Sequence, residues 1–275
     1  MALKRELAAA VAIPAVLAIL FLLPPLAFDA LVAAIALAAL WEFYRMAEKT
    51  GHPVAKSLGL VAAAAALAAI AGATAAGGDR VASFWPLFFA ILAVTFAASV
   101  APLFAGIAPP AALAGAGSTL FGIAAVALPA GAMCYLRSFS PRAVLFLFLI
   151  VWGCDSFAYY TGRAFGRRKL APVVSPNKTW EGTLGGLAGA TLIGAAAGEW
   201  GLMPELGPAV GAAAGALASS AGQIGDLVES LWKRGAGVKD SGTFLPGHGG
   251  FYDRIDSLLF AGPVLAAILV WAGRR

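Results

Sequence analysis

The sequence predicts an all-α polytopic integral membrane protein with about nine transmembrane helices and a cytoplasmic N-terminus. Three observations predict this class: the composition, the length of the apolar runs and the distribution of the cations. Of the 275 residues, 61% are hydrophobic and only 12% are charged, whereas a soluble domain carries about 25% charged residues. Runs of about 20 apolar residues cross the hydrocarbon layer as helices. Their continuous apolar character excludes the alternating strands of a membrane β-barrel.

Nine apolar segments are separated by charged residues or by Pro and Gly, and each is expected to form a helix. The expected ranges are 7–24, 26–46, 57–77, 82–106, 116–136, 142–161, 183–203, 207–229 and 255–273. Two alternatives stay open, because Pro24-Pro25 is either a tight turn or a kink and 101–116 could contain a re-entrant piece. Cys134 and Cys154 are expected to be small buried side chains, since no metal or disulfide spacing is present.

The nineteen Lys and Arg residues divide unequally between the two sides that nine spans define. Fourteen fall on the side of the N-terminus and five on the other. Because cytoplasmic loops carry the excess of Lys and Arg, the N-terminus is expected in the cytoplasm and the C-terminus outside. The first apolar run is expected to be retained rather than cleaved as a signal peptide. The basic loops 162–182 and 230–254 then face the cytoplasm of a bacterial-type inner membrane, although 162–169 could be an orientation signal alone.

The segment 230–256 combines charge types that an orientation signal does not need. It contains four cations, three carboxylates and one of only two histidines. Asp253 and Asp256 lie three residues apart at the start of an apolar helix, so their side chains share one face. One Asp suffices to cap a helix. Two carboxylates on one face also make an oxygen site suited to Mg²⁺.

Further acids lie inside expected spans. Gln223, Asp226 and Glu229 form a polar stripe at a spacing of three, and Asp155 lies in the helix expected over 142–161. Acids in a span are costly and normally face a cavity or a partner. For Asp155 a purely structural ion pair or hydrogen bond is the alternative.

Glycines surround His248. Gly247, Gly249 and Gly250 allow backbone N–H groups to approach phosphate oxygens, although the sequence has no Walker A pattern. A polyphosphate cradle is suggested by these glycines together with the cations Lys233, Arg234, Lys239 and Arg254.

A second polar stretch, Ser175–Gly182, precedes the helix expected over 183–203. Read alone, it is a cytoplasmic turn followed by a capped helix, with Trp180 as an interfacial anchor.

At these residues the sequence resembles the phosphatidate cytidylyltransferase family, also called CDP-diglyceride synthetases. Ser230–Asp256 matches the family signature S-x-φ-K-R-x₄-K-D-x-small-x₂-φ-[PG]-x-H-G-G-φ-x-D-R-φ-D, where φ is usually aliphatic or Phe. Trp232 departs from it, which is a local packing change. Ser175–Gly182 resembles the family's S-P-x-K-T-x-E-G loop, and Asp155 begins a segment resembling D-x-x-A-Y. The similarity is clear over about 150–260.

The resemblance implies a dimeric, Mg²⁺-dependent enzyme that joins CTP to phosphatidate, giving CDP-diacylglycerol and pyrophosphate in phospholipid biosynthesis. The family is also thought to use a second, monovalent cation, and no nucleic acid is expected as a partner. The implied metal ligands are Asp226, Asp253 and Asp256. The implied catalytic residues are Lys233, Arg234, Lys239, Asp240, His248 and Arg254. The implied substrate-binding residues are Ser175, Asn177, Lys178, Glu181, Asp155, Gly249 and Gly250. The helices of 1–140 then precede a catalytic region over 141–275.

Within such a site, the larger cationic set suits a triphosphate and a single Lys suits a monoester. We therefore expect the signature to cradle CTP and the metal. Ser175, Asn177 and Lys178 are expected to hold the lipid phosphate. The opposite allocation and one shared pocket remain open, and His248 is expected to hydrogen-bond phosphate rather than to protonate a leaving oxygen.

Three rival functions fit the sequence less well. A CDP-alcohol phosphotransferase needs a DGxxAR…GxxxDxxxD pattern, which the chain lacks. A CTP-dependent kinase of a polyprenol or phytol would release CDP rather than pyrophosphate. An ion-coupled transporter using Asp155 and Asp226 would commonly show internal repeats, and none is clear.

Overall fold

The computed structural model describes residues 13–75, 84–104, 109–242 and 249–273. A short apolar helix, Ile13–Leu22, is followed by helices that overlap all the remaining predicted spans. These helices are α2 (Pro25–Lys49), α3 (Lys56–Ala75), α4 (Phe84–Phe104), α5 (Pro109–Gly122), the π-helical η1 (Ile123–Ala127), α6 (Leu128–Phe139), α7 (Pro141–Phe165), α8 (Trp180–Glu199), α9 (Gly207–Gly235) and α10 (Tyr252–Ala272). A 3₁₀ turn, η2 (Pro204–Leu206), precedes α9.

Among the described residues, five helices are long and apolar enough to cross a membrane. They are Pro25–Lys49, Lys56–Thr74, Ala111–Phe139, Pro141–Phe165 and Tyr252–Ala272. The prediction of an all-α, multi-pass membrane protein is therefore confirmed. The number of crossings stays a prediction, because α8 and α9 are rich in glycine and are not among these five.

The chain forms two compact units. Unit 1 comprises Met1–Ser138 and Gly235–Arg254, and unit 2 comprises Phe139–Arg234 and Ile255–Arg275. The signature segment therefore contributes residues to both units. The functional division predicted at residue 140 stays a prediction, because compact units describe packing rather than catalysis.

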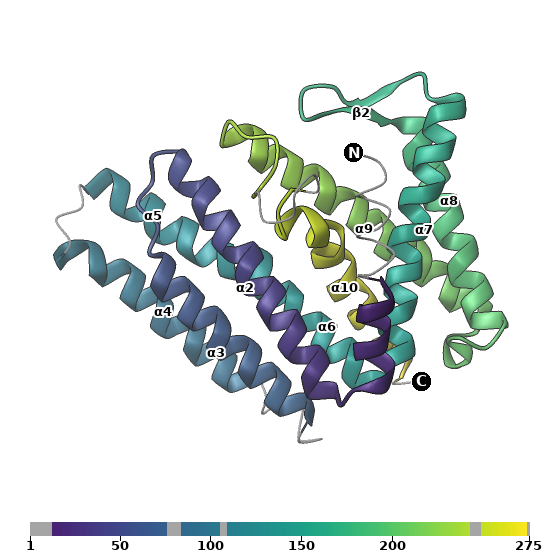
Figure 1. The fold of residues 1–275 in the computed structure, drawn as a ribbon, viewed down its shortest axis with the longest axis horizontal. Coiled ribbons are helices and arrows are strands. Elements are labelled where there is room, and N and C mark those ends of the chain that lie inside the picture. Colours follow the sequence, from purple (N-terminus) through teal and green to yellow (C-terminus); the bar gives the residue numbers. More distant parts are fainter. Residues whose placement is uncertain (1–12, 76–83, 105–108, 243–248, 274–275) are drawn as a thin grey trace. The chain divides into compact units, whose positions relative to one another are not determined.

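In unit 1, helices α2, α3 and α4 lie side by side (Figure 1). Pro24 has an extended conformation (φ −56°, ψ 151°) and Pro25 is the first residue of α2, because a residue before proline avoids the helical region and proline fits a first helical turn. The double proline is thus a helix break.

Cys134 is a buried free thiol, as predicted.

The predicted span 116–136 is part of a longer continuous helix. It begins at Pro109 and runs through α5, η1 and α6 to Phe139, so no break occurs within 109–116. The re-entrant alternative for 101–116 stays open, because 105–108 falls outside the described residues. The π-helical turn lies beside α2, where the Tyr44 hydroxyl donates to the Thr119 carbonyl at 2.8 Å. A side chain at Gly122 would overlap Tyr44, so this glycine permits the close approach of the two helices.

In unit 2, a short antiparallel hairpin connects α7 to α8 (Figure 1). Its strands are β1 (Lys169–Ala171) and β2 (Ser175–Thr179), with Lys169 opposite Thr179 and Ala171 opposite Ser175. The sequence did not predict these strands. The capped helix expected after Ser175 is present, since the Thr179 hydroxyl accepts from the Gly182 N–H at 3.1 Å, but Ser175–Thr179 is a strand and the turn lies before it at 172–174.

Glycines bring the helices of unit 2 together. Side chains added at Gly186 or Gly189 would meet α7 at Cys154 or Phe157. A side chain at Gly194 would meet the backbone of Gly211 in α9. Small residues at these spacings let helix backbones approach closely in lipid. The glycine stripe of α8 is therefore used for packing inside the chain.

Candidate active site

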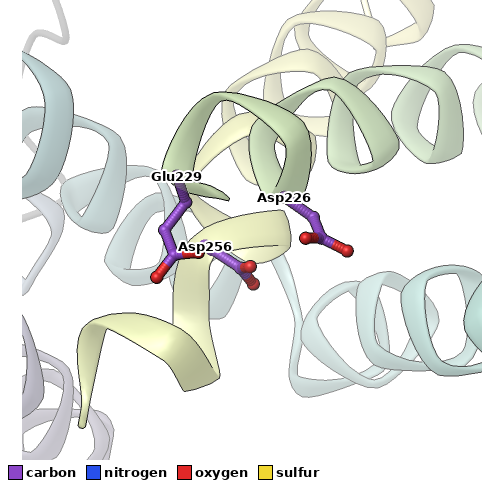
Figure 2. A group of neighbouring side chains, drawn as sticks. All are labelled: Asp226, Glu229 and Asp256. Atoms are coloured by element: carbon purple, nitrogen blue, oxygen red, sulfur yellow. The ribbon is translucent and has the colours of Figure 1, made fainter. Parts of the chain in front are cut away.

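An acidic cluster joins α9 to α10 within unit 2. Among the described residues, the side chains of Asp226, Glu229 and Asp256 each place one carboxylate oxygen within 4.8 Å of the others. Figure 2 shows Asp226 and Glu229 on α9 and Asp256 on the neighbouring α10, with all three carboxylates gathered in one place. Asp226 and Glu229 meet there because residues three apart share one helical face.

Glycine makes this approach of the two helices possible. A side chain at Gly225 would meet the Asp256 carbonyl oxygen at 2.8 Å and the Phe260 ring at 2.7 Å. At Gly222 a side chain would touch Ser257 and Ala261. These two glycines, which both precede Asp226, therefore allow its helix to lie directly against the start of α10.

Two lysines contact the acidic cluster. Lys178, from β2, lies 2.7 Å from Asp226 Oδ2. Lys233 lies 2.6 Å from Glu229 Oε2, one turn along the same helix. Glu229 is only 1% exposed, and a buried carboxylate needs such a charged partner. The Asp256 carboxylate accepts the Ser257 N–H at 2.6 Å.

Asp155, on α7, interacts electrostatically with Asp226, Asp256 and Lys178. Among the described residues, four carboxyl groups and two ammonium groups therefore interact in this part of unit 2. Oxygen donors that outnumber their cationic partners are suited to a hard divalent cation such as Mg²⁺ or Mn²⁺. The residues present thus fit a divalent metal on the chemistry of their donor atoms.

The β1–β2 hairpin is held next to the acidic cluster by two residues of α9. Lys178 pairs with Asp226, and Arg234 Nε donates to the Val174 carbonyl at 3.4 Å. The structure therefore brings the polar stretch at 175–182 and the start of the signature together. Ser175 and Lys178 are half-buried on this hairpin, and Asn177 is exposed.

Glu181 fixes the base of the hairpin. Its carboxylate accepts the backbone N–H of Arg167 at 3.0 Å and that of Arg168 at 3.2 Å. These N–H groups, that of Arg167 foremost, hold the pKa of the exposed Glu181 below its usual range. The predicted substrate contact of Glu181 stays a prediction, while its observed contacts are with its own chain.

Asp253, the third predicted metal ligand, has a different set of contacts. In unit 1 its Oδ2 accepts the Ser241 N–H at 3.0 Å, the Ser241 hydroxyl at 2.8 Å and the Gly250 N–H at 2.7 Å. Gly249 has a φ of +75°, a conformation that favours glycine. The carboxylate therefore binds the turn that leads into α10.

The other predicted site residues of unit 1 lie around this turn. Lys239, Asp240 and Arg254 are exposed, Gly249 is half-buried and Gly250 is buried. The predictions for Gly247 and His248 fall outside the described residues. The roles given to all of these residues stay predictions.

Glu229 belongs to the acidic cluster but was not among the predicted metal ligands. The polar stripe Gln223, Asp226 and Glu229 was visible in the sequence, but only Asp226 of this stripe was predicted as a ligand. The spacing of three from Asp226 is the signal that could have identified Glu229. Gln223, the first member of the stripe, instead donates to the Thr183 carbonyl of α8 at 3.3 Å.

The family model and the relatives that match this chain point to the same family. Residues 3–272 match the model of the cytidylyltransferase family. Three relatives are named phosphatidate cytidylyltransferase. The protein from Pseudomonas aeruginosa is 45% identical over 130 residues, covering 47% of this chain and 48% of the relative. The protein from Brucella abortus is 48% identical over 134 residues, covering 46% of each chain.

The third relative, from Staphylococcus epidermidis, is 44% identical over 142 residues, which cover 49% of this chain and 51% of the relative. The chain thus spans about half the length of the curated relatives it matches. Because the family model covers nearly the whole chain, the protein belongs to the cytidylyltransferase family.

Proposed function

We propose that this protein is a phosphatidate cytidylyltransferase, which condenses CTP with phosphatidate to give CDP-diacylglycerol and pyrophosphate. One observation carries the proposal: an acidic cluster that fits a divalent cation joins the end of the signature, at Asp256, to Asp226 and Glu229, and it lies beside the hairpin that carries Lys178. Family membership and the names of the relatives support the same activity.

The proposed reaction is a nucleotidyl transfer. A phosphate oxygen of phosphatidate forms a bond to the α-phosphorus of CTP while the bond from that phosphorus to the β-phosphate oxygen breaks, and pyrophosphate leaves. A phosphate monoester is already largely ionised near pH 7, with a second pKa of about 6. The protein therefore needs no strong base, and its task is to position two anions and to absorb charge.

Asp226, Glu229 and Asp256 are the residues that would hold the divalent cation, which we propose to be Mg²⁺. When bound, the cation would neutralise phosphate charge and help to orient the substrates. Glu229 joins the proposed set, while Asp253 is proposed to hold the turn at Ser241 and Gly250, because its Oδ2 accepts the backbone N–H groups of both residues. Lys233, Arg234, Lys239 and Arg254 are proposed to bind the phosphates of CTP.

Lys178 is proposed to bind the lipid phosphate. Its ammonium group lies 2.7 Å from Asp226, so a phosphate attached there would lie beside the acidic cluster. This contact supports a single site in which the two phosphates meet at the level of the hairpin. Ser175 and Asn177 are proposed to add hydrogen bonds to the same phosphate.

The proposed setting is an inner membrane, with the hairpin and signature on the cytoplasmic side and two copies forming a homodimer. The fourteen-to-five division of the cations supports this orientation. A cysteine placed at Ser241 in a cysteine-free variant should resist an impermeant thiol reagent in intact cells. Labelling from outside would invert the topology, and a monomeric mass for active protein in nanodiscs would refute the dimer.

The experiment for the activity uses purified protein in phosphatidate-containing nanodiscs with labelled CTP and Mg²⁺. Pyrophosphate and CDP-diacylglycerol should form in equal amounts, and neither should form when phosphatidate is omitted. Release of CDP would instead indicate a CTP-dependent lipid kinase. No turnover of CTP under any of these conditions would refute the enzyme.

A further inference from the structure

Glu42 is a buried carboxylate that belongs neither to the signature nor to the acidic cluster. It lies in the cytoplasmic half of the predicted second span, on α2, and is only 6% exposed. An acid in a membrane helix is costly unless a partner or a function retains it. Its partners lie about 200 residues away in the sequence, within the same compact unit.

Both oxygens of Glu42 accept hydrogen bonds from the signature. The Phe251 N–H donates to Oε1 at 3.1 Å, and the Tyr252 N–H donates to Oε2 at 2.9 Å. These N–H groups are at the very start of α10, where no partner exists within the helix. The negative charge also lies at the positive end of the helix dipole. Glu42 therefore caps α10 from another helix.

The same carboxylate also holds the N-terminal end of the loop that runs from Ser241 to the start of α10, which we call the signature loop. The Ser241 hydroxyl lies 2.9 Å from Glu42 Oε2 and 2.8 Å from Asp253 Oδ2. It has one hydrogen, so it donates to one carboxylate at a time. Glu42 and Asp253 together form what we call the two-carboxylate clamp, which joins the residues at 241–242 to those at 250–252.

Two glycines leave the space that the Glu42 carboxylate occupies. A side chain at Gly242 or at Gly250 would overlap the Glu42 carboxylate. Both glycines belong to the signature, and neither has a positive φ. Their lack of a side chain is therefore explained here by the approach of Glu42 and not by backbone conformation.

We infer that Glu42 is a positioning residue for the cytidylyl transfer, which fixes both ends of the signature loop and the first turn of α10. The inference rests on the proposed function. Glu42 touches no substrate in this scheme. It acts through the loop residues that it holds, so its loss should lower turnover more than substrate affinity.

The test compares Glu42→Gln with wild-type protein. Glutamine has the same size, but only one of its two terminal atoms accepts a hydrogen bond. One of the two amides at Phe251 and Tyr252 would face an NH₂ group. We expect kcat to fall about 10- to 100-fold, because small displacements of reacting groups slow the chemical step by such factors. KM for CTP and for phosphatidate should change less than about threefold. Glu42→Asp keeps the charge and should retain more activity than Glu42→Gln.

Glu48→Gln is the matched control. Glu48 lies on the same helix, is exposed and pairs with Lys56 at 2.7 Å. This variant should keep wild-type kcat. Gly242→Ala disturbs the same contact from the loop, because the added methyl group would overlap the Glu42 carboxylate. It should reproduce the kcat loss of Glu42→Gln without changing Glu42 itself.

Amide hydrogen exchange provides a readout that does not depend on activity. The peptide covering 249–256 should exchange about tenfold faster in Glu42→Gln than in wild-type protein or Glu48→Gln. Wild-type kcat in Glu42→Gln, or lost activity with unchanged exchange of this peptide, would overturn the inference. If wild-type protein made no CDP-diacylglycerol, the proposed function would fail, and hydrogen exchange would still decide whether Glu42 holds the loop.

Discussion

Two groups of carboxylates in this protein are satisfied in different ways. In unit 1, Glu42 and Asp253 accept hydrogen bonds from backbone N–H groups and the Ser241 hydroxyl. In unit 2, Asp226, Glu229 and Asp256 lie beside one another, and among the described residues Lys178 and Lys233 form ion pairs with them. A carboxylate that accepts several N–H groups is suited to holding a fold, whereas neighbouring carboxylates are suited to sharing a cation.

This comparison separates residues that the signature places side by side. Asp253 and Asp256 are one helical turn apart, and the sequence predicts the same role for both. Their contacts differ because Asp253 faces the turn through Ser241 and Gly250. Asp256 belongs to the group that includes Asp226 and Glu229. Sequence spacing therefore identifies a shared face but not shared contacts.

The largest expected effect is the loss of an acidic-cluster residue. Asp226→Asn and Asp256→Asn should each lower kcat roughly 100- to 1,000-fold, because charge stabilisation at the reacting phosphates is lost. The measurement is CDP-diacylglycerol formation at saturating substrates, with protein quantified after purification. Near wild-type rates for both variants at saturating Mg²⁺ would remove the acidic cluster from the reaction.

Asp253→Asn should have a smaller effect of a different kind. Asparagine can still offer one oxygen to Ser241 and Gly250, although a neutral acceptor forms weaker hydrogen bonds than a carboxylate. We expect kcat to fall about tenfold, with the half-saturating Mg²⁺ concentration within twofold of wild type. A marked rise in the Mg²⁺ requirement would instead restore Asp253 as a metal ligand.

Lys178→Ala tests the link between the hairpin and the acidic cluster. The apparent KM for phosphatidate should rise about tenfold, with a much smaller change for CTP, because one charged hydrogen bond to phosphate is lost. Lys239→Ala should show the reverse pattern. Selective weakening of CTP binding by Lys178→Ala, measured without lipid, would show that the allocation of the two phosphates is wrong.

The smallest expected effect concerns Glu181. Glu181→Gln should loosen the hairpin base and speed trypsin cleavage after Arg167 and Arg168 by a few-fold at neutral pH, because an exposed carboxylate contributes little. Its lowered pKa means that this contribution is present at neutral pH and is lost as the pH falls below about 4.5. Equal cleavage rates in the two proteins would show that the carboxylate does not secure the hairpin.

The sequence predicted the helices well, because apolar runs, charges and prolines mark their limits. Pro25 and Pro141 each begin a helix that the sequence placed within a few residues. The β1–β2 hairpin was not predicted, since strands of three and five residues carry too little pattern. Glu42 was missed because its partners lie far away in the sequence. An acid within an apolar helix was the available signal, and it was applied to Asp155, Asp226 and Glu229 but not to Glu42.

The most direct test of the difference between the two groups of carboxylates is a measurement of Mn²⁺ binding in the absence of nucleotide. Binding to protein in nanodiscs is detected by electron paramagnetic resonance. Wild-type protein and Asp253→Asn should bind Mn²⁺ with the same affinity. Glu229→Gln and Asp256→Asn should bind it at least about tenfold more weakly, because each removes a charged ligand. Retained binding in Glu229→Gln together with lost binding in Asp253→Asn would contradict the division between a metal site and a loop clamp.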